Sequence, residues 1–342
     1  MSAPDTGVTG EVGLAVGRDP ERMRSALRTW LPGGCRLTAV VPLSTGHSNE
    51  TYLLEGLDAV LRMPPVHEGL LPPYDMAAQH ALLAQISVCA EGPPVPRVRE
   101  LCLDRAILGA AFFIMDRAPG TSFDHPHVPA WLLAADAATR SSMCAQWLDA
   151  VVAVSRIPAA RMVGVPHRAP NEEASHWLTV AESAQAPAAL LNVLADLVAA
   201  PPPSSGPPTS VHGDTRHANC LWHEAQLTAL VDWELAGVGD PMLDLGNTVA
   251  YFPDGVTPLV TAGFDLAGWW ERGRVIEAWE RGTGRTADGL ARWEGLAMAR
   301  LAAILAVGAQ LHREGRARDA RFAVWAETLP LYVQLIEVRL QL

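Results

Sequence analysis

Cysteine is scarce in this sequence, and none of the five cysteines forms a CxxC pair. That absence argues against a CxxC redox or zinc motif, and the odd count does not suggest a disulfide framework. Residues 1–20 lack the basic segment and apolar run of a secretion signal, and we expect no apolar run near the ~20 residues that a membrane helix needs. The sequence therefore predicts reduced thiols and a cytoplasmic protein without a membrane segment.

Basic residues are outnumbered as well, because 26 Lys plus Arg stand against 37 Asp plus Glu, giving a net charge of −11. A protein that binds nucleic acid generally needs a basic face for the phosphates. We therefore expect no nucleic-acid partner and a small molecule as substrate. With 342 residues, of which 49% are hydrophobic, the chain is long enough for one large domain or two lobes. We expect a monomer or a homodimer.

The hydrophobic pattern divides the chain into a β-rich part and a helical part. Strand-like runs at 35–44, 50–56, 58–64, 97–104 and 110–118 accompany helix-like periodicity at 19–31 and 74–86. Helical periodicity then dominates at 131–156, 176–199, 265–282, 286–313 and 317–340, with two β-like runs at 219–224 and 227–234. We predict an α+β fold: a small β-rich lobe at 1–117, a connector near 113–119, and a larger, mainly helical lobe at 118–342.

One short stretch, VHGDTRHANCLW, concentrates polar residues just before and within the first of these late β-like runs. If the hairpin turn has four residues, its register pairs Asn219 with Asp232, and directly opposed residues have Cβ atoms roughly 4.5–5.5 Å apart. Such a pair suits Mg²⁺, which takes one or two carboxylates plus water and substrate phosphates. Asp214 lies in the loop that leads to the same end and could accept a proton from a hydroxyl. The stretch thus predicts a phosphoryl-transfer site with Asp214 as catalytic base and Asn219 and Asp232 as metal ligands.

The sequence resembles the aminoglycoside phosphotransferase-like family of small-molecule kinases, in four segments: STGHSNETYLL, VLRMPP, VHGDTRHAN and LVDWELAGVGDPMLDL. The last two are specific, because HGD-x4-N followed by VDWE and GDP-x2-DL rarely arises by chance. The arginine of VLRMPP makes the chain similar to the kinase-like domain fused to some acyl-CoA dehydrogenases. The likeness spans 37–252. It implies a bilobal protein kinase-like fold, ATP or GTP as co-substrate, and Mg²⁺ as cofactor.

The resemblance also implies a nucleotide site. The segment TGHSN would cover the phosphates, and Arg62 would stand where the family's phosphate-binding lysine stands. Backbone at Met115 to Arg117 would read the purine edge. The nucleotide-binding residues implied in this way are Gly46, His47, Ser48, Asn49, Arg62, Met115 and Arg117.

Two positions depart from the family's pattern. Arg62 replaces lysine, and the planar guanidinium differs in geometry from a compact ammonium group. Gln79 stands where a partner glutamate is expected on the first helix of the β-rich lobe, so it can hydrogen-bond Arg62 but supplies no countercharge. Glu68 or Asp75 could supply that charge instead. These departures leave the preference between ATP and GTP open.

For several other polar residues the sequence allows two different roles. His217 could face the acceptor or be simply exposed, and Glu234 could accept a structural hydrogen bond or lie near a second metal ion. Glu172 and Glu173 could line the acceptor pocket or only begin a helix, where acids favour the first turn. By resemblance three further residues are structural: His212, Asp240 and Asp244.

The expected function is Mg²⁺-dependent transfer of the γ-phosphate of ATP or GTP to a hydroxyl of a small molecule. The composition, rich in Ala, Arg, Gly and Pro, suggests a GC-rich genome, so an antibiotic of aminoglycoside, macrolide or nucleoside type is the acceptor that we favour. A metabolic kinase for choline, homoserine or a hydroxyacyl compound would use the same chemistry with another pocket.

Two alternatives belong to other classes. A catalytically weak nucleotide-binding protein is motivated by Arg62 and Gln79, although the intact catalytic and metal residues speak against it. A histidine–zinc hydrolase would need a zinc-binding spacing, and His212, His217 and His223 match none that we recognise.

Overall fold

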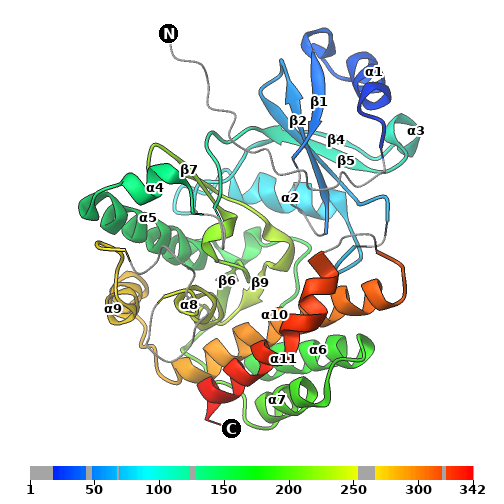
Figure 1. Cartoon of the computed structure of the whole chain (residues 1–342). Coiled ribbons are helices and arrows are strands. Elements are labelled where there is room, and N and C mark those ends of the chain that lie inside the picture. Colours follow the sequence, from blue (N-terminus) through cyan, green and yellow to red (C-terminus); the bar gives the residue numbers. More distant parts are fainter. Residues whose placement is uncertain are drawn as a thin grey trace.

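The computed structural model of the chain describes residues 18–43, 48–67, 69–123, 128–252, 266–317 and 321–341. A lobe built on a β-sheet lies above a larger helical lobe in Figure 1, and the chain passes from the first to the second after residue 116. The predicted α+β fold with a small β-rich lobe and a larger helical lobe is confirmed.

The smaller lobe contains a five-stranded antiparallel sheet in the order β1-β2-β3-β5-β4. Each strand falls inside a run that alternation predicts. The central strand carries Arg62, which lies between Thr51 on one side and Phe113 on the other. The strands are β1 (Ala39–Pro42), β2 (Glu50–Glu55), β3 (Ala59–Met63), β4 (Val98–Cys102) and β5 (Phe112–Asp116).

Two longer helices pack on this sheet. Helix α1 (Pro20–Trp30) begins where Asp19 accepts hydrogen bonds from first-turn N–H groups, and it buries Met23 and Leu27 with strand residues in a compact core. Helix α2 (Met76–Ile86) packs on β4 and β5 and buries its apolar side in a core that continues into the larger lobe. Helix α2 therefore lies between the sheet and the helical lobe. The short helix α3 (Arg105–Leu108) follows β4.

The larger lobe is organised around α10 (Leu290–Arg313), which packs against α6, α7, α8 and α11. By length and composition α10 could cross a membrane, which corrects our expectation that no run is long and apolar enough. Yet 72% of its most apolar window is buried inside the protein, as expected for a core helix. The other helices are α4 (Ala130–Ala134), α5 (Ala137–Arg156), α6 (Pro170–Ser183), α7 (Ala188–Ala199), α8 (Met242–Val249), α9 (Arg272–Thr283) and α11 (Arg321–Leu340).

Two predicted helical segments are each divided in two. The segment at 131–156 breaks before Asp136, whose carboxylate accepts a hydrogen bond from the Thr139 N–H and so begins α5. The segment at 176–199 breaks where Gln185 takes a positive φ of 51° and Pro187 precedes α7. In both cases local backbone chemistry ends a helix that periodicity alone continues.

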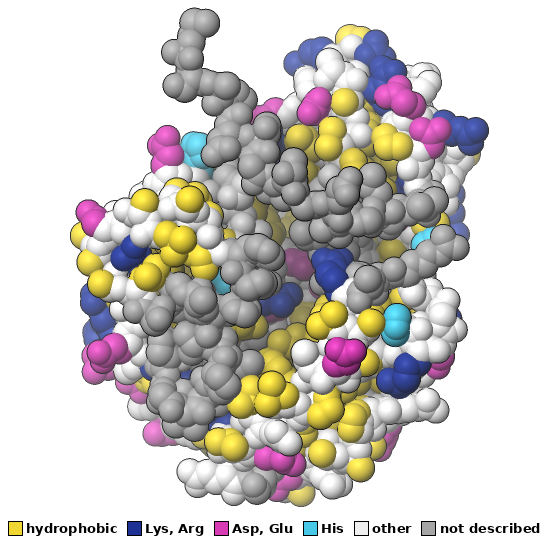
Figure 2. Space-filling model, viewed as in Figure 1, with side chains coloured by type: hydrophobic (Ala, Val, Ile, Leu, Met, Phe, Trp, Pro, Cys, Tyr) yellow, Lys and Arg dark blue, Asp and Glu magenta, His cyan; other side chains and the backbone are white. Residues whose placement is uncertain are grey.

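Four short strands bring the polar stretch of the sequence to the boundary between the lobes. β6 (Thr209–Val211) pairs with β9 (Gly237–Gly239), and β7 (Cys220–His223) pairs with β8 (Gln226–Leu230). The loop between β6 and β7 and the segment after β8 therefore lie next to each other. In Figure 2, acidic and basic side chains meet in the hollow between the two lobes.

Candidate active site

Gly213 sets the course of the loop between β6 and β7. Its φ is +83°, and a Cβ at this position would lie 2.4 Å from the Leu235 carbonyl oxygen and 2.9 Å from Arg300 Nη2. Only glycine fits such a conformation and such crowding without strain. A side chain at this position, such as the arginine of an HRD motif, has no room here.

Asp214 follows directly, with its side chain 16% exposed. Asn219 Nδ2 donates hydrogen bonds to Asp214 Oδ2 and to the Asp214 carbonyl oxygen, both at 2.9 Å. Arg216 Nε lies 3.2 Å from Asp214 Oδ2. The carboxylate is therefore held by an amide and a guanidinium while part of it still faces the cleft.

His212 lies behind this loop and is fully buried. Its Nδ1 accepts a hydrogen bond from the Asp214 N–H at 3.2 Å, and its Nε2 lies 3.1 Å from the Val231 carbonyl oxygen. Burial lowers the pKa of His212 below its usual value. A neutral imidazole that joins the loop to the hairpin is consistent with the structural role expected from the resemblance.

The hairpin between β7 and β8 corrects one prediction. Its turn contains two residues, Glu224 and Ala225, both with positive φ, in place of the expected four. A bulge follows, and the Val231 N–H donates to the Asn219 carbonyl oxygen at 2.8 Å, so Asn219 lies opposite Val231 and not opposite Asp232. The sequence misled us because two-residue turns of this kind favour Asn-Gly, not Glu-Ala.

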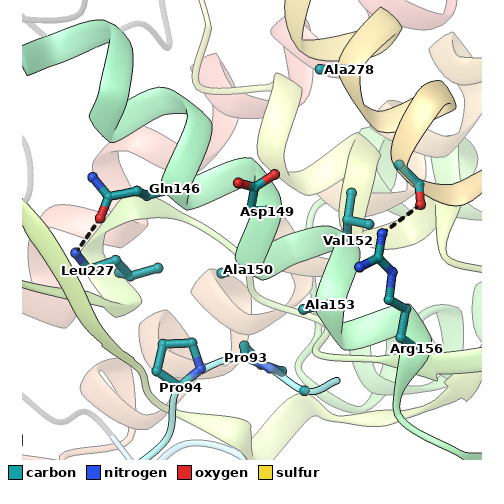
Figure 3. A pocket seen from close by; sticks show the side chains of 12 residues that line it. Pro93, Pro94, Gln146, Asp149, Ala150, Val152, Ala153, Arg156, Leu227 and Ala278 are labelled. Carbon is teal, nitrogen blue, oxygen red and sulfur yellow. Dashed lines mark hydrogen bonds between the residues drawn. The ribbon is translucent and has the colours of Figure 1, made fainter. Parts of the chain in front are cut away.

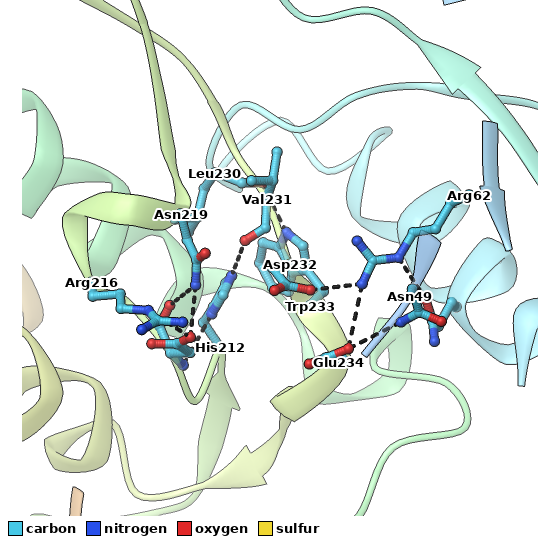
Figure 4. A network of polar contacts seen from close by, with 12 residues as sticks. Asn49, Arg62, His212, Arg216, Asn219, Leu230, Val231, Asp232, Trp233 and Glu234 are labelled. Carbon is cyan, nitrogen blue, oxygen red and sulfur yellow. Dashed lines mark hydrogen bonds and ion pairs between the residues drawn. The ribbon is translucent and has the colours of Figure 1, made fainter. Parts of the chain in front are cut away.

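Asp232 nevertheless reaches the same place. It has a left-handed backbone conformation, with φ 68°, and begins the 3₁₀ turn Trp233–Leu235. Arg62 Nη2 on β3 lies 2.7 Å from Asp232 Oδ1 and 3.4 Å from Glu234 Oε2 (Figure 4). The segment after β8 is thereby joined to the central strand of the other lobe.

The two carboxylates respond differently to this environment. Burial works against ionisation of Asp232, but the Arg62 guanidinium outweighs it and holds the pKa of Asp232 below its usual value. Burial and the neighbouring charge of Asp232 raise the pKa of Glu234 to about 7. Although Arg62 contacts both carboxylates, the pKa of Asp232 is lowered and the pKa of Glu234 is raised.

Gln79 of α2 accepts a hydrogen bond from Arg62 Nε at 3.2 Å. Asp75 does not supply the missing countercharge, because its carboxylate begins α2 by accepting the Ala78 N–H. Glu68 lies outside the described residues. The sequence contains no lysine, since all 26 of its Lys plus Arg residues are arginine. The arginine at position 62 therefore follows the composition of the whole chain and is not a change confined to this motif.

The predicted phosphate loop is described only in part. Ser48 and Asn49 are both buried, whereas Gly46 and His47 lie outside the described residues. Asn49 Nδ2 donates to Glu234 Oε2 at 3.1 Å, and Ser48 also hydrogen-bonds Glu234. The end of this loop is therefore attached to the same glutamate that contacts Arg62.

The segment predicted to read the purine lies at the end of β5. The N–H groups of Asp116 and Arg117 already donate to the carbonyl oxygens of Arg97 and Asp58. They are therefore not available to a purine, and the Arg117 side chain points to solvent. Met115 lines a small cavity of about 40 Å³ beside Arg62, Gln79 and Asp232.

Two residues predicted to be structural bind backbone. Asp244 accepts the N–H groups of His212 and Gly213, both at 2.8 Å. Asp240 accepts the Ser205 N–H at 2.6 Å and the Met242 N–H at 3.0 Å. Asp244 therefore fixes the loop between β6 and β7, and Asp240 fixes the start of α8 to the loop before β6.

Three residues considered for the acceptor pocket have other surroundings. His217 is 1% exposed and lies within 6.0 Å, ring centroid to ring centroid, of three aromatic side chains: Phe123, Trp147 and Tyr251. Glu172 accepts the Ala169 N–H at 2.8 Å at the start of α6. Glu173 is buried, with Oε1 3.0 Å from Arg300 Nε and Oε2 3.1 Å from Arg168 Nη1. Glu172 therefore stabilises the start of α6, as one of its two interpretations expects, whereas Glu173 belongs to a buried ion pair.

Sequence reasoning did not single out Arg216 or Tyr332 of α11. Burial raises the pKa of Tyr332 well above its usual value, and Tyr251, Arg216 and Asp214 lie close enough to affect it. The C-terminal helix therefore lies close to the loop between β6 and β7. Because Arg216 is two residues from Asp214, the sequence could have predicted that the two side chains lie close together. Tyr332 lies 118 residues away in sequence (332 minus 214), so no sequence pattern predicts its proximity to Asp214.

The donor set suits a magnesium ion. The described hydrogen bonds of Asn219 use Nδ2, and those of Asp232 use Oδ1, so an oxygen of each remains for a metal. Oxygen ligands with one carboxylate are what Mg²⁺ takes when phosphates and water complete its shell. Within the described ranges, no group of three or more His, Cys, Asp or Glu residues could hold a metal ion by itself. Any metal here would thus depend on phosphate oxygens.

A further pocket, of about 550 Å³, lies between α5, α9 and the 92–94 loop. Gln146 and Arg156 at its rim hydrogen-bond the backbone of Leu227 and Gly282 (Figure 3). No residue that lines it belongs to the predicted site. Its size exceeds that of the cavity beside Arg62, but Asp149 is the one carboxylate among its lining residues.

Comparison with known proteins adds a family, a relative and two structures. A family model described as the phosphotransferase enzyme family matches residues 39–296. Acyl-CoA dehydrogenase family member 10 of Mus musculus is 28% identical over 222 residues, which cover 63% of this chain and 20% of that protein. The chain thus spans about a fifth of the length of this curated relative.

Both structures share the fold. A protein of Ralstonia eutropha assigned to the aminoglycoside phosphotransferases has a TM-score of 0.73 at 20% identity, covering 95% of this chain and 99% of its own. Macrolide 2′-phosphotransferase of Brachybacterium faecium has a TM-score of 0.55 at 21% identity, covering 91% and 98%. At such identities the likeness establishes the fold alone.

Proposed function

The chain belongs to the phosphotransferase enzyme family, as its motifs predicted, and from this premise we propose that it transfers the γ-phosphate of ATP or GTP to a hydroxyl of a small molecule with Mg²⁺ as cofactor. The observation that carries the proposal is the juxtaposition of Asp214, Asn219 and Asp232 beside Arg62. A general base, two oxygen ligands and a cation at one point of an interlobe cleft are what phosphoryl transfer requires.

In this proposal Asp214 orients the acceptor hydroxyl and takes its proton as the oxygen bonds to the γ-phosphorus and the bond to the leaving diphosphate breaks. Asn219 keeps the Asp214 carboxylate in place through its hydrogen bond at 2.9 Å. Arg62 stabilises negative charge on the phosphates. Mg²⁺, held by Asn219 and Asp232, would supply further neutralisation of the phosphate charge.

The purine would be read from beyond the end of β5. The Asp116 and Arg117 N–H groups already have partners, whereas no described hydrogen bond uses the N–H of Ala118, and Pro119 has none. We therefore place the purine-facing donor at Ala118, three residues after Met115, which lines the cavity beside Arg62.

For the acceptor we favour a hydroxyacyl compound. The curated relative named an acyl-CoA dehydrogenase family member points to acyl chemistry. An antibiotic acceptor is the second candidate, supported by the fold shared with a macrolide phosphotransferase.

The test is a mass-spectrometric screen with ATP and with GTP against hydroxyacyl thioesters, homoserine, choline, macrolides, nucleosides and aminoglycosides. We expect one class to gain a phosphoryl group only when Mg²⁺ is present. The Asp214→Ala protein is the control, and its phosphorylating the acceptor at the wild-type rate would show that the base is misassigned. Tight nucleotide binding without any phosphorylated product would favour a catalytically weak nucleotide-binding protein.

A further inference from the structure

Arg62 lies against a helix that offers it no charge. The whole of α2, MAAQHALLAQI, contains no acidic residue. Its contribution is the neutral amide of Gln79, 3.2 Å from Arg62 Nε. The side chain of Arg62 is only 15% exposed, so solvent compensates little of its charge. A buried guanidinium without a carboxylate partner is strongly unfavourable.

The countercharge comes from the other lobe. Asp232 and Glu234, 170 and 172 residues further along the chain, both contact Arg62 Nη2. Asp232 has a second task in the proposed function, because it would bind the metal ion. Glu234 Oε2 already contacts both groups, because it lies 3.4 Å from Arg62 Nη2 and accepts a hydrogen bond from Asn49 Nδ2 at 3.1 Å.

We propose that Glu234 is a positioning residue that holds Arg62 and the end of the phosphate loop in place once Asp232 binds the metal. This inference rests on the proposed function, since it takes the nucleotide phosphates as the ligand of Arg62. The partner carboxylate expected on α2 is thus replaced by one on the segment after β8. Arg62 is then correctly oriented only when the two lobes are closed on each other.

Variants that move the carboxylate test the proposal directly. Glu234→Gln keeps the shape and removes the charge, so it weakens binding of ATP·Mg²⁺ by about tenfold, the scale of one lost charge-assisted hydrogen bond. Gln79→Glu returns a carboxylate to α2 on the other side of Arg62. In the Glu234→Gln background it restores most of the lost affinity.

The effect of Glu234→Gln on ATP affinity should depend on whether Mg²⁺ is present. Without Mg²⁺, Asp232 keeps its contact with Arg62, so Glu234→Gln weakens binding of ATP in EDTA by only about twofold. With Mg²⁺, Asp232 is engaged and the effect reaches its full size. Glu224→Gln, at the exposed turn of the same hairpin, is the matched control and binds as the wild type does.

Calorimetric titration without acceptor gives these affinities, and thermal unfolding confirms that each variant folds. Wild-type affinity in Glu234→Gln, or no rescue by Gln79→Glu, would overturn the positioning role while leaving the proposed function intact. If the wild-type protein itself binds neither ATP·Mg²⁺ nor GTP·Mg²⁺, the proposed function fails instead. A residue that merely supports folding would not be rescued from the opposite side of Arg62.

Discussion

Carboxylates lie on both sides of the loop between β6 and β7, and the two groups differ in which atoms satisfy their hydrogen-bonding oxygens. On the cleft side, three carboxylates are partly exposed: Asp214 (16%), Asp232 (32%) and Glu234 (20%). The hydrogen bonds and ion pairs described for these carboxylates all come from other side chains. On the far side, Asp244 is 2% exposed and accepts two backbone N–H groups. Glu173, also on the far side, is 7% exposed and bonded to two arginines and a tryptophan.

The difference separates two tasks. A carboxylate whose oxygens are fully used fixes the backbone and cannot take a ligand, because an unmade hydrogen bond to a buried group is costly. A carboxylate with oxygen to spare can exchange partners when a ligand arrives. Substitutions on the cleft side should therefore lower activity at constant stability, and those on the far side should lower stability first.

The largest expected effect is on the cleft side. Asp214→Asn removes the proposed base but keeps the hydrogen bonds of its neighbours, so kcat should fall by about 10²–10⁴-fold. The unfolding midpoint in urea should stay close to that of the wild type. Asp149→Asn, an exposed residue of α5, is the control and should leave both quantities unchanged. Loss of stability comparable to the loss of activity would contradict the division into two groups.

Asp244→Asn tests the far side. The amide has one oxygen for two buried N–H groups, so one donor loses its acceptor and the free energy of unfolding should drop by about 2–3 kcal/mol. Urea denaturation measures this change. Because His212 and Gly213 are the donors, activity should fall as well. An Asp244→Asn protein that is as stable as the wild type would show that the loop does not depend on this carboxylate.

Glu173→Gln adds a pH dependence. Burial opposes ionisation of Glu173, but Arg300 outweighs it and holds the pKa below its usual value. A depressed pKa means that the stabilisation is present above the unfolded value of about 4.3 and is lost as pH falls through the folded value. The variant should therefore be less stable than the wild type by about 1.5–3 kcal/mol at pH 7, and the gap should narrow below about pH 4.

Glu172→Gln provides a matched control one residue away. It keeps a side-chain oxygen for the Ala169 N–H at the exposed start of α6, so it should cost well under 1 kcal/mol at any pH. Denaturation curves at several pH values compare the two variants. Equal losses in both, or a gap that does not change with pH, would contradict the buried ion pair as the source of stability.

The smallest expected effect concerns Asn49, which joins the phosphate loop to Glu234. Asn49→Ala removes one hydrogen bond of 3.1 Å and should weaken nucleotide binding by about 2–5-fold, with kcat nearly unchanged. Asn171→Ala, exposed at the start of α6, should bind nucleotide normally. A loss in kcat larger than the loss in affinity would assign Asn49 to the chemical step and contradict its assignment to nucleotide binding.

Much of the fold follows from sequence pattern because the relevant forces are local. Alternation locates all five strands of the sheet, and helical periodicity locates the long helices. The errors arise where one residue's backbone decides the outcome. Positive φ at Glu224 and Ala225 shortens the hairpin turn, and Asp136 restarts a helix that its periodicity continues.

Part of the candidate site also follows from sequence. Asp214 and Asn219 share one loop, and Asp232 follows two residues after β8, so their proximity is encoded by a short hairpin. Glu173 could not be assigned in this way. Acids at a helix start usually face solvent, and its partner Arg300 is 127 residues away (300 minus 173) on α10.

By itself the sequence determined the family and the two-lobed fold and predicted the catalytic residues of the loop between β6 and β7, because these depend on motifs and periodicities a few residues long. The absence of lysine, also a property of the sequence, left arginine as the cation available for position 62. Only the tertiary structure decided which carboxylate balances that cation. An ion pair between β3 and the segment after β8 joins residues about 170 positions apart, and such a contact depends on how the two lobes pack.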